Sequence, residues 1–505
     1  MARPLLSAAQ IQALETRLAT DGAPPAILMQ RAGEALLRCL RANWPEARRV
    51  LVVVGPGNNG GDGYVLARLL DARPDTQATI VRLAEPRASE ARAAADAWRA
   101  TGGDVDAWCA DGPLPAADVI VDALFGVGLS RALEGEAKAL VDAINDHPAP
   151  VLAVDLPSGM DADTGSSAGP VIRATRTLCL LARKRGLFTG RAADLTGAVD
   201  FADLGATSLS GDDDADVDAA VEIAGRRSPG GFTLARLLER GDLKRWLPRR
   251  SRSAHKGDHG HAMVAGGDVG MAGAVTIAGH AALRAGAGLV SIATRDAHAM
   301  SSGPARPEIM RHGVEDAGAF AALLPHADAL AIGPGMGTTA WGRMLFDAAL
   351  KATCPIVFDA DALNLLARSP RALGDRVVLT PHPGEAGRLL DRPTDAVEAD
   401  RFAAARELAR RFDCVVVLKG AGTIIDDGRR TLVCPFGNPG MASGGMGDAL
   451  AGIVAGFMAQ GLSAADAAAA GVLAHALAGD RAARLGERGV TASDLIECLR
   501  MVVNP

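Results

Sequence analysis

Aromatic residues are scarce in this sequence: they make up 3% of the 505 residues, and there is a single tyrosine. The hydrophobic share is nevertheless 49%, so the chain must build its cores from alanine, valine, leucine and isoleucine. At this length one core is not enough, and we expect two or three domains. The 59 glycines indicate tight turns or close approach of the backbone to ligands.

The sequence also lacks the features of several protein classes. Its seven cysteines contain no CxxC pair, which argues against a zinc site or a disulfide framework. A net charge of −6 argues against nucleic acid as a partner. The N-terminus has no signal-peptide core, and no apolar run is long enough to cross a membrane. We therefore expect a cytoplasmic homo-oligomer that acts on small molecules, with no nucleic-acid or membrane partner.

Two series of strands and helices run along the chain. Short apolar strands alternate with helices from residue 50 to 181 and again from residue 261 onward. This pattern predicts parallel sheets with helices on both faces. The stretch between the series contains the acidic run Gly211–Asp218 and the breaker-rich segment Arg226–Gly231. We predict an α/β protein with one domain at 1–210, a linker at 211–240 and a second, larger domain at 241–505.

In the first half, polar glycine-rich segments follow three of the predicted strands. GPGNNGGDG (Gly55–Gly63) lies between a strand and a helix, where N–H groups at a helix N-terminus can bind a pyrophosphate. VDALFGVGLSR (Val121–Arg131) and AVDLPSGMD (Ala153–Asp161) end two further strands. Ligands of open parallel sheets bind beyond the carboxyl ends of the strands, so the three segments predict one crevice. Read alone, the first loop does not match the Walker pattern, and a glycine-rich turn without a ligand is its alternative.

NNGGDG, D-x-x-x-G-x-G and D-[LI]-P-S-G, in this order, resemble the NAD(P)H-hydrate epimerase family over residues 1–205. The resemblance implies a Rossmann-like three-layer α/β/α domain. The residues that it assigns to the hydrated dinucleotide are Asn58, Asn59, Gly60, Gly61, Asp62, Gly126, Val127, Gly128, Leu129, Ser130, Arg131, Ala132 and Asp155. It assigns K⁺, a hard cation that prefers oxygen donors, to Asn59, Asp122 and Ser158. Asp155 would be the acid/base group facing the ring. Lys184 has two alternatives, a lysine of this site and a surface lysine, between which the sequence does not decide.

The second half carries a stronger signal. NPGMASGGMGDALAG (Asn438–Gly452) is a glycine-rich loop that runs into a helix, so the N–H groups of Gly444–Gly447 would form an anion hole. Asp448 lies in the first turn, where a carboxylate can take the proton of a hydroxyl that attacks a phosphate. This arrangement is typical of ribokinase-like small-molecule kinases. A charge that only stabilises the helix N-terminus is the alternative for Asp448, and HKGDHGH (His255–His261) is a weak metal motif.

HKGDHG, GGDVGMAGA, GPGMG, DADALN, TPHPGE, KGAGT and GGMGD resemble the ADP/ATP-dependent NAD(P)H-hydrate dehydratases over residues 240–500. The resemblance implies a ribokinase-like α/β domain. The residues that would contact the hydrated dinucleotide are Ala274, Gly335, His382 and Asp448. Those that would contact the adenine nucleotide are Lys419, Gly420, Ala421, Gly422, Thr423 and Gly447. Asp448 would be the catalytic base, with Mg²⁺ accompanying ADP or ATP.

Both halves retain their catalytic residues, so we predict a bifunctional enzyme. One half would interconvert the R and S forms of hydrated NADH and NADPH, and the other would dehydrate the S form at the expense of ADP or ATP. One alternative, a ribokinase-like kinase of a vitamin alcohol, leaves the N-terminal crevice unexplained. Another alternative makes the first half a non-catalytic binding module, against which the presence of Asn59, Asp122, Asp155 and Ser158 argues. The sequence does not decide whether ADP or ATP is the phosphate donor, or whether hydrated NADH or hydrated NADPH is the preferred substrate.

Overall fold

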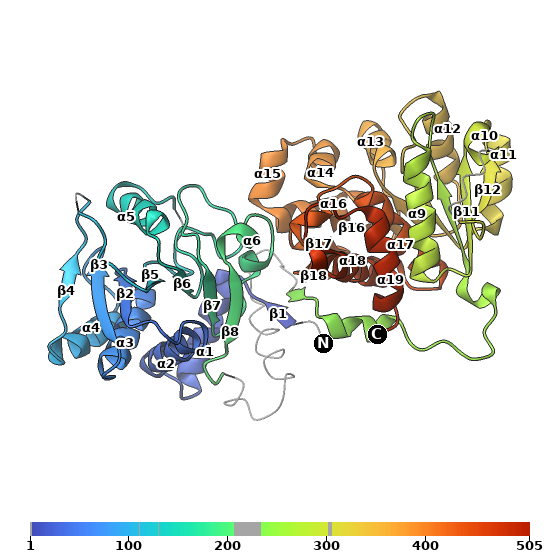
Figure 1. Cartoon of the computed structure of the whole chain (residues 1–505). Helices are drawn as coiled ribbons and strands as arrows, with labels where there is room; N and C mark the ends of the chain where they lie inside the picture. The colour runs from blue at the N-terminus through green and yellow to red at the C-terminus, as the bar shows by residue number, and fades with distance from the viewer. Residues whose placement is uncertain (1–2, 111, 130, 207–233, 301–305) are drawn as a thin grey trace. The chain divides into compact units, whose positions relative to one another are not determined.

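A computed structural model of the chain describes residues 3–110, 112–129, 131–206, 234–300 and 306–505. These residues form two compact units, one of Pro4–Ala235 and one of Arg236–Pro505 together with Arg3 (Figure 1). The change of unit falls within 211–240, but the acidic run and most of that stretch lie outside the described residues, as does Ser130. No helix in the described part of the chain has the length and apolarity that a membrane crossing requires.

The N-terminal unit is built around a seven-stranded sheet in the order β4-β3-β2-β5-β6-β7-β8, in which all neighbours are parallel. Its strands are β2 (Arg49–Val54), β3 (Gln77–Arg82), β4 (Val105–Ala107), β5 (Val119–Ala123), β6 (Val151–Val154), β7 (Arg176–Leu180) and β8 (Ala198–Ala202). Its helices are α1 (Ala8–Thr20), α2 (Pro25–Asn43), α3 (Asn58–Asp71), α4 (Ser89–Ala100), α5 (Gly135–Asp146), the 3₁₀ turn η1 (Arg185–Phe188) and α6 (Ala192–Leu195), and a short strand, β1 (Arg3–Leu5), precedes them. The strand order reverses between β2 and β5, so the loops after these strands face a topological switch point.

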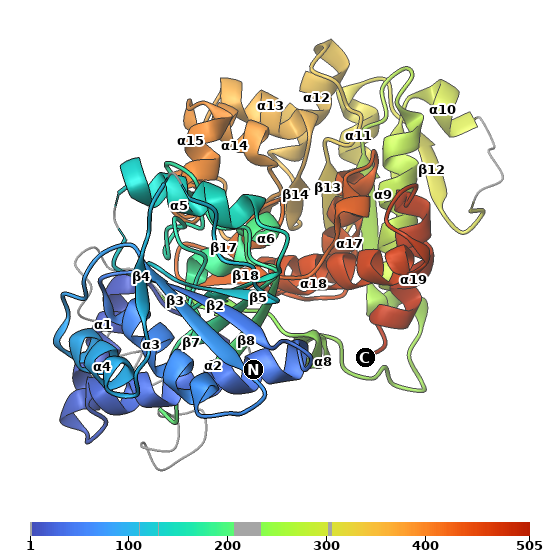
Figure 2. The same ribbon diagram turned by 60° about the vertical axis from the view of Figure 1, so that its left-hand side comes forward.

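Strand β2 is buried on both faces of this sheet. Val50, Val52 and Val54 pack with helices α1, α2 and α3, whereas Leu51 and Val53 pack with α5. Figures 1 and 2 show α5 on the opposite side of the sheet from α2 and α3. Successive side chains of a strand point to opposite faces, so burial on both faces explains the unbroken apolar run in the sequence.

The C-terminal unit contains a mixed sheet that runs β9-β18-β17-β16-β15-β14-β13-β10-β11-β12. Its strands are β9 (Ala235–Leu237), β10 (His261–Ala265), β11 (Leu289–Thr294), β12 (Met310–Gly313), β13 (Ala329–Ile332), β14 (Ile356–Phe358), β15 (Val377–Leu379), β16 (Val415–Leu418), β17 (Thr423–Asp426) and β18 (Thr431–Cys434). Neighbours from β16 to β12 are parallel, whereas β17 pairs antiparallel with both β16 and β18. The strand order reverses between β10 and β13, which makes a second switch point.

Helices lie on both sides of this sheet (Figure 2). They are α8 (Leu243–Trp246), α9 (Ala272–Ala285), α10 (Asp296–Met300), α11 (Ala317–Leu323), α12 (Ala340–Ala349), α13 (Asp361–Arg368), α14 (Pro383–Leu390), α15 (Thr394–Ala399), α16 (Arg401–Phe412), α17 (Met446–Ala459), α18 (Ala464–Ala482) and α19 (Ala492–Val502). Short 3₁₀ turns are η3 (Arg240–Asp242), η4 (Lys256–His259), η5 (Leu324–His326), η6 (Pro439–Met441) and η7 (Ala483–Leu485). The α/β class predicted from the sequence is thus confirmed for both halves.

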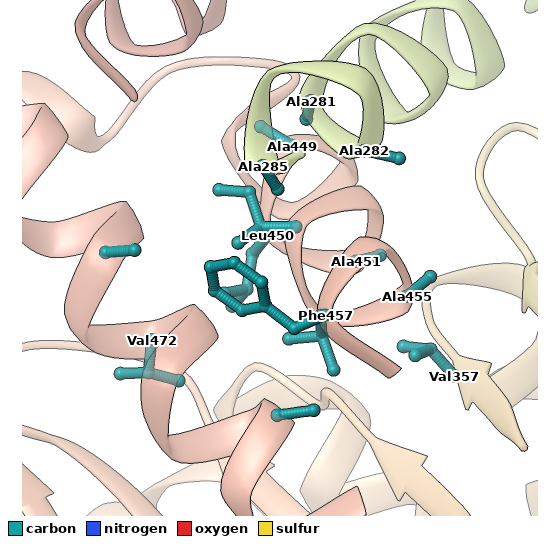
Figure 3. Close-up of a cluster of buried hydrophobic side chains, with 14 of the residues drawn as sticks. Ala281, Ala282, Ala285, Val357, Ala449, Leu450, Ala451, Ala455, Phe457 and Val472 are labelled. Carbon is teal, nitrogen blue, oxygen red and sulfur yellow. The ribbon is translucent and has the colours of Figure 1, made fainter. Parts of the chain in front are cut away.

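Helices α9 and α17 pack closely because small residues face each other. A Cβ added to Gly452 of α17 would lie only 2.0 Å from the carbonyl oxygen of Ala278 in α9. Figure 3 shows the alanines of α9 against α17, whose Phe457 is part of the same buried cluster as Val472 of α18. This alanine-rich packing builds a core with few aromatic rings, and it positions the start of α17, where Asp448 lies.

Strands β4, β8 and β12 are not predicted by the hydrophobic pattern. Each lies at an edge of its sheet, and none of them has a fully buried run of residues. An edge strand has a neighbour on one side only and is less covered, so it does not need a continuous apolar sequence. The hydrophobic pattern therefore predicts the central strands but not these edge strands.

Candidate active sites

A cavity of about 760 Å³ lies at the switch point of the N-terminal sheet. Its wall is formed by helices α1 and α2, the loops after β2 and β5, and the residues that follow β6 and β7. The predicted substrate-binding residues on this wall are Asn58, Asn59, Asp62, Gly126, Val127, Gly128, Leu129, Arg131, Ala132 and Asp155. The structure therefore brings the three polar segments of the sequence together around one space of ligand size.

Two of the predicted substrate-binding glycines, Gly60 and Gly61, do not line this cavity. A Cβ on Gly60 would lie 2.1 Å from the carbonyl oxygen of Gly55, and Gly61 packs in the same way against helix α2. Because these two residues have no side chain, the start of α3 can pack closely against Gly55 and against Met29 of helix α2. In the described part of the chain the N–H groups of Asn58, Asn59 and Gly60 have no acceptor, so the helix start can offer them to an anion.

Asp155 and Lys184 form a buried ion pair on the cavity wall. Asp155 has a φ of +70°, a conformation that non-glycine residues rarely adopt. Its Oδ1 accepts hydrogen bonds from the Lys184 ammonium and, at 3.0 Å, from the N–H of Leu180. Burial is the largest influence on the pKa of Lys184 and acts to lower it, but the charge and hydrogen bond of Asp155, together with Cys179 and Glu15, raise the pKa overall. Lys184 is 1% exposed, so it belongs to the site and not to the surface.

Two further carboxyl groups, those of Asp62 and Glu15, face the same cavity. Burial raises the pKa of each, and the negative charge of Asp155 raises it further. Neither group is hydrogen-bonded or ion-paired within the described residues. Glu15 was missed by the sequence analysis because it lies within helix α1 and no motif marks it.

Asp122 and Ser158 are in direct contact behind the loop that follows β5. Ser158 Oγ donates to Oδ1 of Asp122 at 2.6 Å, and the backbone N–H of Ser158 donates to Oδ2 at 2.8 Å. Burial raises the pKa of Asp122 to about 6, although these hydrogen bonds act to lower it. Asn59 lies beside Gly126, and its Nδ2 is buried without a partner in the described residues. Asp122 and Ser158 thus lie in contact, and each of the three side chains carries an oxygen donor of the kind a hard cation requires.

In the C-terminal unit, Asp448 lies in the first turn of helix α17. Across the described residues, the N–H groups of Met446, Gly447 and Asp448 have no acceptor, so the helix start can receive an anion. Burial raises the pKa of Asp448 to about 6, with a further contribution from the charge of Asp359. A carboxyl group with this pKa can exchange a proton near neutral pH, as a general base must.

Lys419 occupies a buried charged cluster beside this helix start. Its Nζ lies 2.8 Å from Oδ1 of Asp359 and 3.7 Å from Oε2 of Glu385. A Cβ on Gly447 would lie 3.3 Å from the same Nζ, which places Gly447 next to the cluster. Burial acts to lower the pKa of Lys419, but the two carboxylates raise it overall. The Lys419 amine is therefore bound by carboxylates of the protein. The predicted contact of this segment with the nucleotide must then be made by the backbone of the turn that begins at Lys419.

The remaining predicted substrate contacts lie at carboxyl ends of neighbouring parallel strands. His382 follows β15 and caps helix α14, where its Nδ1 accepts from the N–H of Gly384 at 3.0 Å. Ala274 and Gly335 follow β10 and β13, and a Cβ on Gly335 would lie 3.1 Å from that of Ala274. These residues therefore share one edge of the sheet with Lys419, which follows β16.

Asp359 and Glu385 were not predicted as site residues, although both lie in motifs used to identify this half. Asp359 is 1% exposed and directly follows β14, the strand between those that carry Gly335 and His382. Thr380 Oγ1 donates to its Oδ1 at 2.7 Å. A carboxylate at the end of a central parallel strand was the signal that could have identified Asp359.

Comparison with known proteins places the two halves in known families. A family described as NAD(P)H-hydrate dehydratase matches residues 262–500, and one described as YjeF-related protein N-terminus matches residues 25–186. A ribokinase-like superfamily protein from Enterococcus faecalis V583 has a TM-score of 0.50 and 28% identity, covering 54% of this chain and 95% of its own. An ADP/ATP-dependent NAD(P)H-hydrate dehydratase from Bacillus subtilis, crystallised with ATP/Mg²⁺, has a TM-score of 0.48 and 29% identity, covering 52% and 96%.

One relative aligns along almost the whole sequence. The bifunctional NAD(P)H-hydrate repair enzyme Nnr of Coxiella burnetii is 45% identical over 509 aligned residues, which cover 98% of this chain and 98% of that protein. Both halves are therefore matched in one continuous relative, in the order that the sequence motifs indicate. The chain belongs to the family of bifunctional NAD(P)H-hydrate repair enzymes.

Proposed function

We propose that the two units catalyse successive steps in the repair of hydrated NADH and NADPH. The N-terminal unit interconverts the R and S epimers at ring carbon C6, and the C-terminal unit dehydrates the S form with ADP or ATP. The observation that carries this proposal is that each switch point has its own buried acid/base group, Asp155 in one unit and Asp448 in the other. A kinase of a vitamin alcohol would have no use for the N-terminal cavity.

In the epimerase site, Asp155 faces the tetrahydronicotinamide ring. Protonation of the C6 hydroxyl by the acid/base group lets it leave as water, and this leaves a cation in which the ring nitrogen shares its lone pair with C6. Addition of water to the opposite face, with loss of one proton, gives the other epimer. A carboxylate held beside the buried Lys184 ammonium can stabilise this cation and accept that proton. The free N–H groups at the start of α3 hold the pyrophosphate.

We assign K⁺ to Asn59, Asp122 and Ser158. The contact between Ser158 and Asp122, and the position of the Asn59 side chain beside Gly126, support this assignment, because all three side chains carry the oxygen atoms that a hard cation prefers. When bound, the ion supplies a positive charge that ties together the loops after β2, β5 and β6. Ser130, which resemblance also assigns to the substrate, lies outside the described residues.

In the dehydratase site, Asp448 takes the proton of the C6 hydroxyl as its oxygen attacks the terminal phosphorus of the nucleotide. The bond from this phosphorus to the bridging oxygen breaks, which releases AMP from ADP or ADP from ATP. The C6 phosphate then leaves with the C–O electron pair while the ring nitrogen donates its lone pair. Loss of a C5 proton restores the dihydronicotinamide. Phosphorylation is needed because hydroxide is a poor leaving group.

The backbone of Lys419–Thr423 and Gly447 holds the nucleotide in this proposal, and Ala274, Gly335 and His382 hold the dinucleotide. Mg²⁺ would neutralise charge on the nucleotide phosphates. The part of the chain that the structure describes contains no group of three or more His, Cys, Asp and Glu side chains suited to a metal.

We further propose that residues 1–210 and 241–505 are the functional domains and that 211–240 link them. The seven cysteines are all free thiols, which supports a reducing compartment such as the cytoplasm. A homo-oligomer remains our expectation, and light scattering of the purified chain measures it directly.

The experiment that tests the function supplies the full chain with a mixture of R- and S-hydrated NADH and follows the return of reduced nicotinamide. With ADP or ATP, and with Mg²⁺ and K⁺ present, both epimers should be consumed. Without nucleotide, the epimers should interconvert and no NADH should form. Parallel assays with ADP and ATP identify the phosphate donor. Nucleotide consumption that leaves the hydrate unchanged would refute the proposal.

A further inference from the structure

Arg401, at the start of helix α16, is one of the largest fully buried side chains of the described protein, with 1% exposure. Its Nη2 donates to the carbonyl oxygens of Leu418 at 3.3 Å and Lys419 at 3.0 Å. Its Nη1 donates to Oε1 of Glu398 at 3.1 Å, and the Glu398 side chain is 37% exposed. A guanidinium stays charged in proteins and must have its donors satisfied when it is buried.

The two carbonyl groups lie where strand β16 ends and the turn to β17 begins. This turn is the segment Lys419–Thr423 to which we assign the adenine nucleotide. A Cβ on Gly420 would lie 2.9 Å from Nη2 of Arg401, and Gly420 has a φ of +134°, so only glycine fits there. The positive charge therefore lies directly under the turn, in helix α16, which packs against β16 and β17 (Figure 1).

In this turn, the carbonyl groups and the N–H groups differ in whether they have hydrogen-bond partners. The carbonyls of Leu418 and Lys419 accept from Arg401, and that of Gly420 accepts from Thr423 Oγ1 at 2.8 Å. The N–H groups of Gly420 and Ala421 have no acceptor in the described part of the chain. The carbonyls at the start of this turn are thus engaged, whereas the N–H groups of Gly420 and Ala421 can be presented to a ligand, as in an anion-binding turn.

We propose that Arg401 is a positioning residue for the nucleotide site of the dehydratase. It draws the Leu418 and Lys419 carbonyls toward α16, so that their negative ends do not face the phosphates, and it adds a fixed positive charge beneath the turn. It does not touch the nucleotide. This inference rests on the proposed assignment of Lys419–Thr423 to the nucleotide.

Arg406, in the same helix, provides a matched control. Its side chain is also buried, at 12% exposure, and its Nε lies 2.9 Å from Oδ2 of the fully buried Asp426. It also donates to Thr431 of strand β18. Arg406 therefore braces the β17-β18 hairpin, whereas Arg401 holds the turn between β16 and β17.

The test measures KM for the nucleotide and kcat at saturating nucleotide in the full chain, together with the melting temperature. Arg401→Met should raise the nucleotide KM about 10- to 100-fold, the range for loss of hydrogen bonds to a charged group, with a smaller change in kcat. Arg401→Lys should recover part of this affinity, because one ammonium can reach a carbonyl. Arg406→Met should lower the melting temperature and leave the nucleotide KM unchanged.

A separate variant tests the turn itself. Ala421 is exposed, and Ala421→Glu places a negative charge on the turn without altering Arg401, so it should raise the nucleotide KM. No effect of Ala421→Glu would overturn the assignment of the turn. A clear effect of Ala421→Glu, together with an unchanged KM in Arg401→Met, would overturn the role of Arg401 alone. If Arg401→Met does not fold, the test uses Arg401→Lys and measures how much added ADP raises its melting temperature. A rise equal to that of the wild type would overturn the proposal.

Discussion

The ammonium of Lys419 lies 2.8 Å from Oδ1 of Asp359, and this buried pair acts electrostatically on Asp448. The negative charge of Asp359 raises the pKa of Asp448, and the positive charge of Lys419 lowers it. Burial remains the largest cause of the raised pKa of Asp448. Burial therefore sets most of the pKa shift of the proposed base, and Asp359 and Lys419, which lie outside the motif around Asp448, adjust it.

The pH dependence of dehydration should report on Asp448. The proposed base works in its ionised form, and its pKa is about 6. The value of kcat/KM for the hydrate, which reports on the free enzyme, should therefore be constant above neutral pH and fall tenfold for each pH unit below about 6. Single-turnover measurements across this range check the expectation. A rate that stays constant down to pH 4.5 would show that no group with this pKa must be ionised.

Variants of the charged pair should shift this profile in opposite directions. Asp359→Asn removes a neighbouring negative charge, so the acid limb should move to lower pH. Lys419→Met removes a positive charge, so the limb should move to higher pH. Both profiles are recorded at saturating nucleotide, which separates the shift from any change in nucleotide affinity. Shifts of the same sign would contradict the electrostatic account.

Asp448→Asn should abolish most dehydration while nucleotide binding remains nearly intact. Loss of a general base typically costs about 10²–10⁴-fold in rate, and the amide keeps the size of the side chain in the first helical turn. Calorimetry with ADP measures binding, and the return of reduced nicotinamide measures turnover. Lost nucleotide affinity with normal turnover at saturation would assign Asp448 to binding instead.

Asp155→Asn should disable the epimerase site and leave the dehydratase site intact. Given both epimers and nucleotide, this variant should convert the S form at the wild-type rate and then stall, because the R form drains only by the slow spontaneous reaction. Rapid consumption of the R form would remove Asp155 from the mechanism.

The same substitution leaves the buried Lys184 ammonium without its carboxylate, which typically costs about 3–5 kcal/mol. The double variant Asp155→Asn with Lys184→Met removes both charges, and it should be more stable than the single variant while remaining inactive as an epimerase. Thermal melting and epimer analysis of both variants separate a catalytic loss from a folding loss.

His475 makes a pH-dependent contribution to stability. Its Nε2 donates to the carbonyl oxygen of Met446 at 3.0 Å, and burial lowers its pKa to about 4. An unfolded chain binds a proton there near pH 6.5, so the contribution is complete above that pH and is lost as the pH falls toward 4. The loss amounts to about 2 kcal/mol at pH 5. Urea unfolding at pH 7 and pH 5 should show less acid sensitivity in His475→Gln, which keeps a donor but does not titrate.

The sequence by itself determined the fold class and the central strands, and it predicted sites at the ends of those strands. Buried parallel strands require continuous apolar runs, so linear patterns were sufficient for strands such as β2 and β10, and the polar loops after them carry the predicted site residues such as Asp448. The edge strands β4, β8 and β12 lack that constraint and were not predicted. Local sequence carries little information about them.

Only the tertiary structure decided which charges face one another. Lys184 and Lys419 each pair with a carboxylate from a distant strand end, Asp155 and Asp359, and Glu15 enters the epimerase cavity from helix α1. Arg401 meets the nucleotide turn only because α16 packs beneath it. Residues far apart in the chain become neighbours through packing, and the burial that raises or lowers their pKa values arises only when the core is assembled.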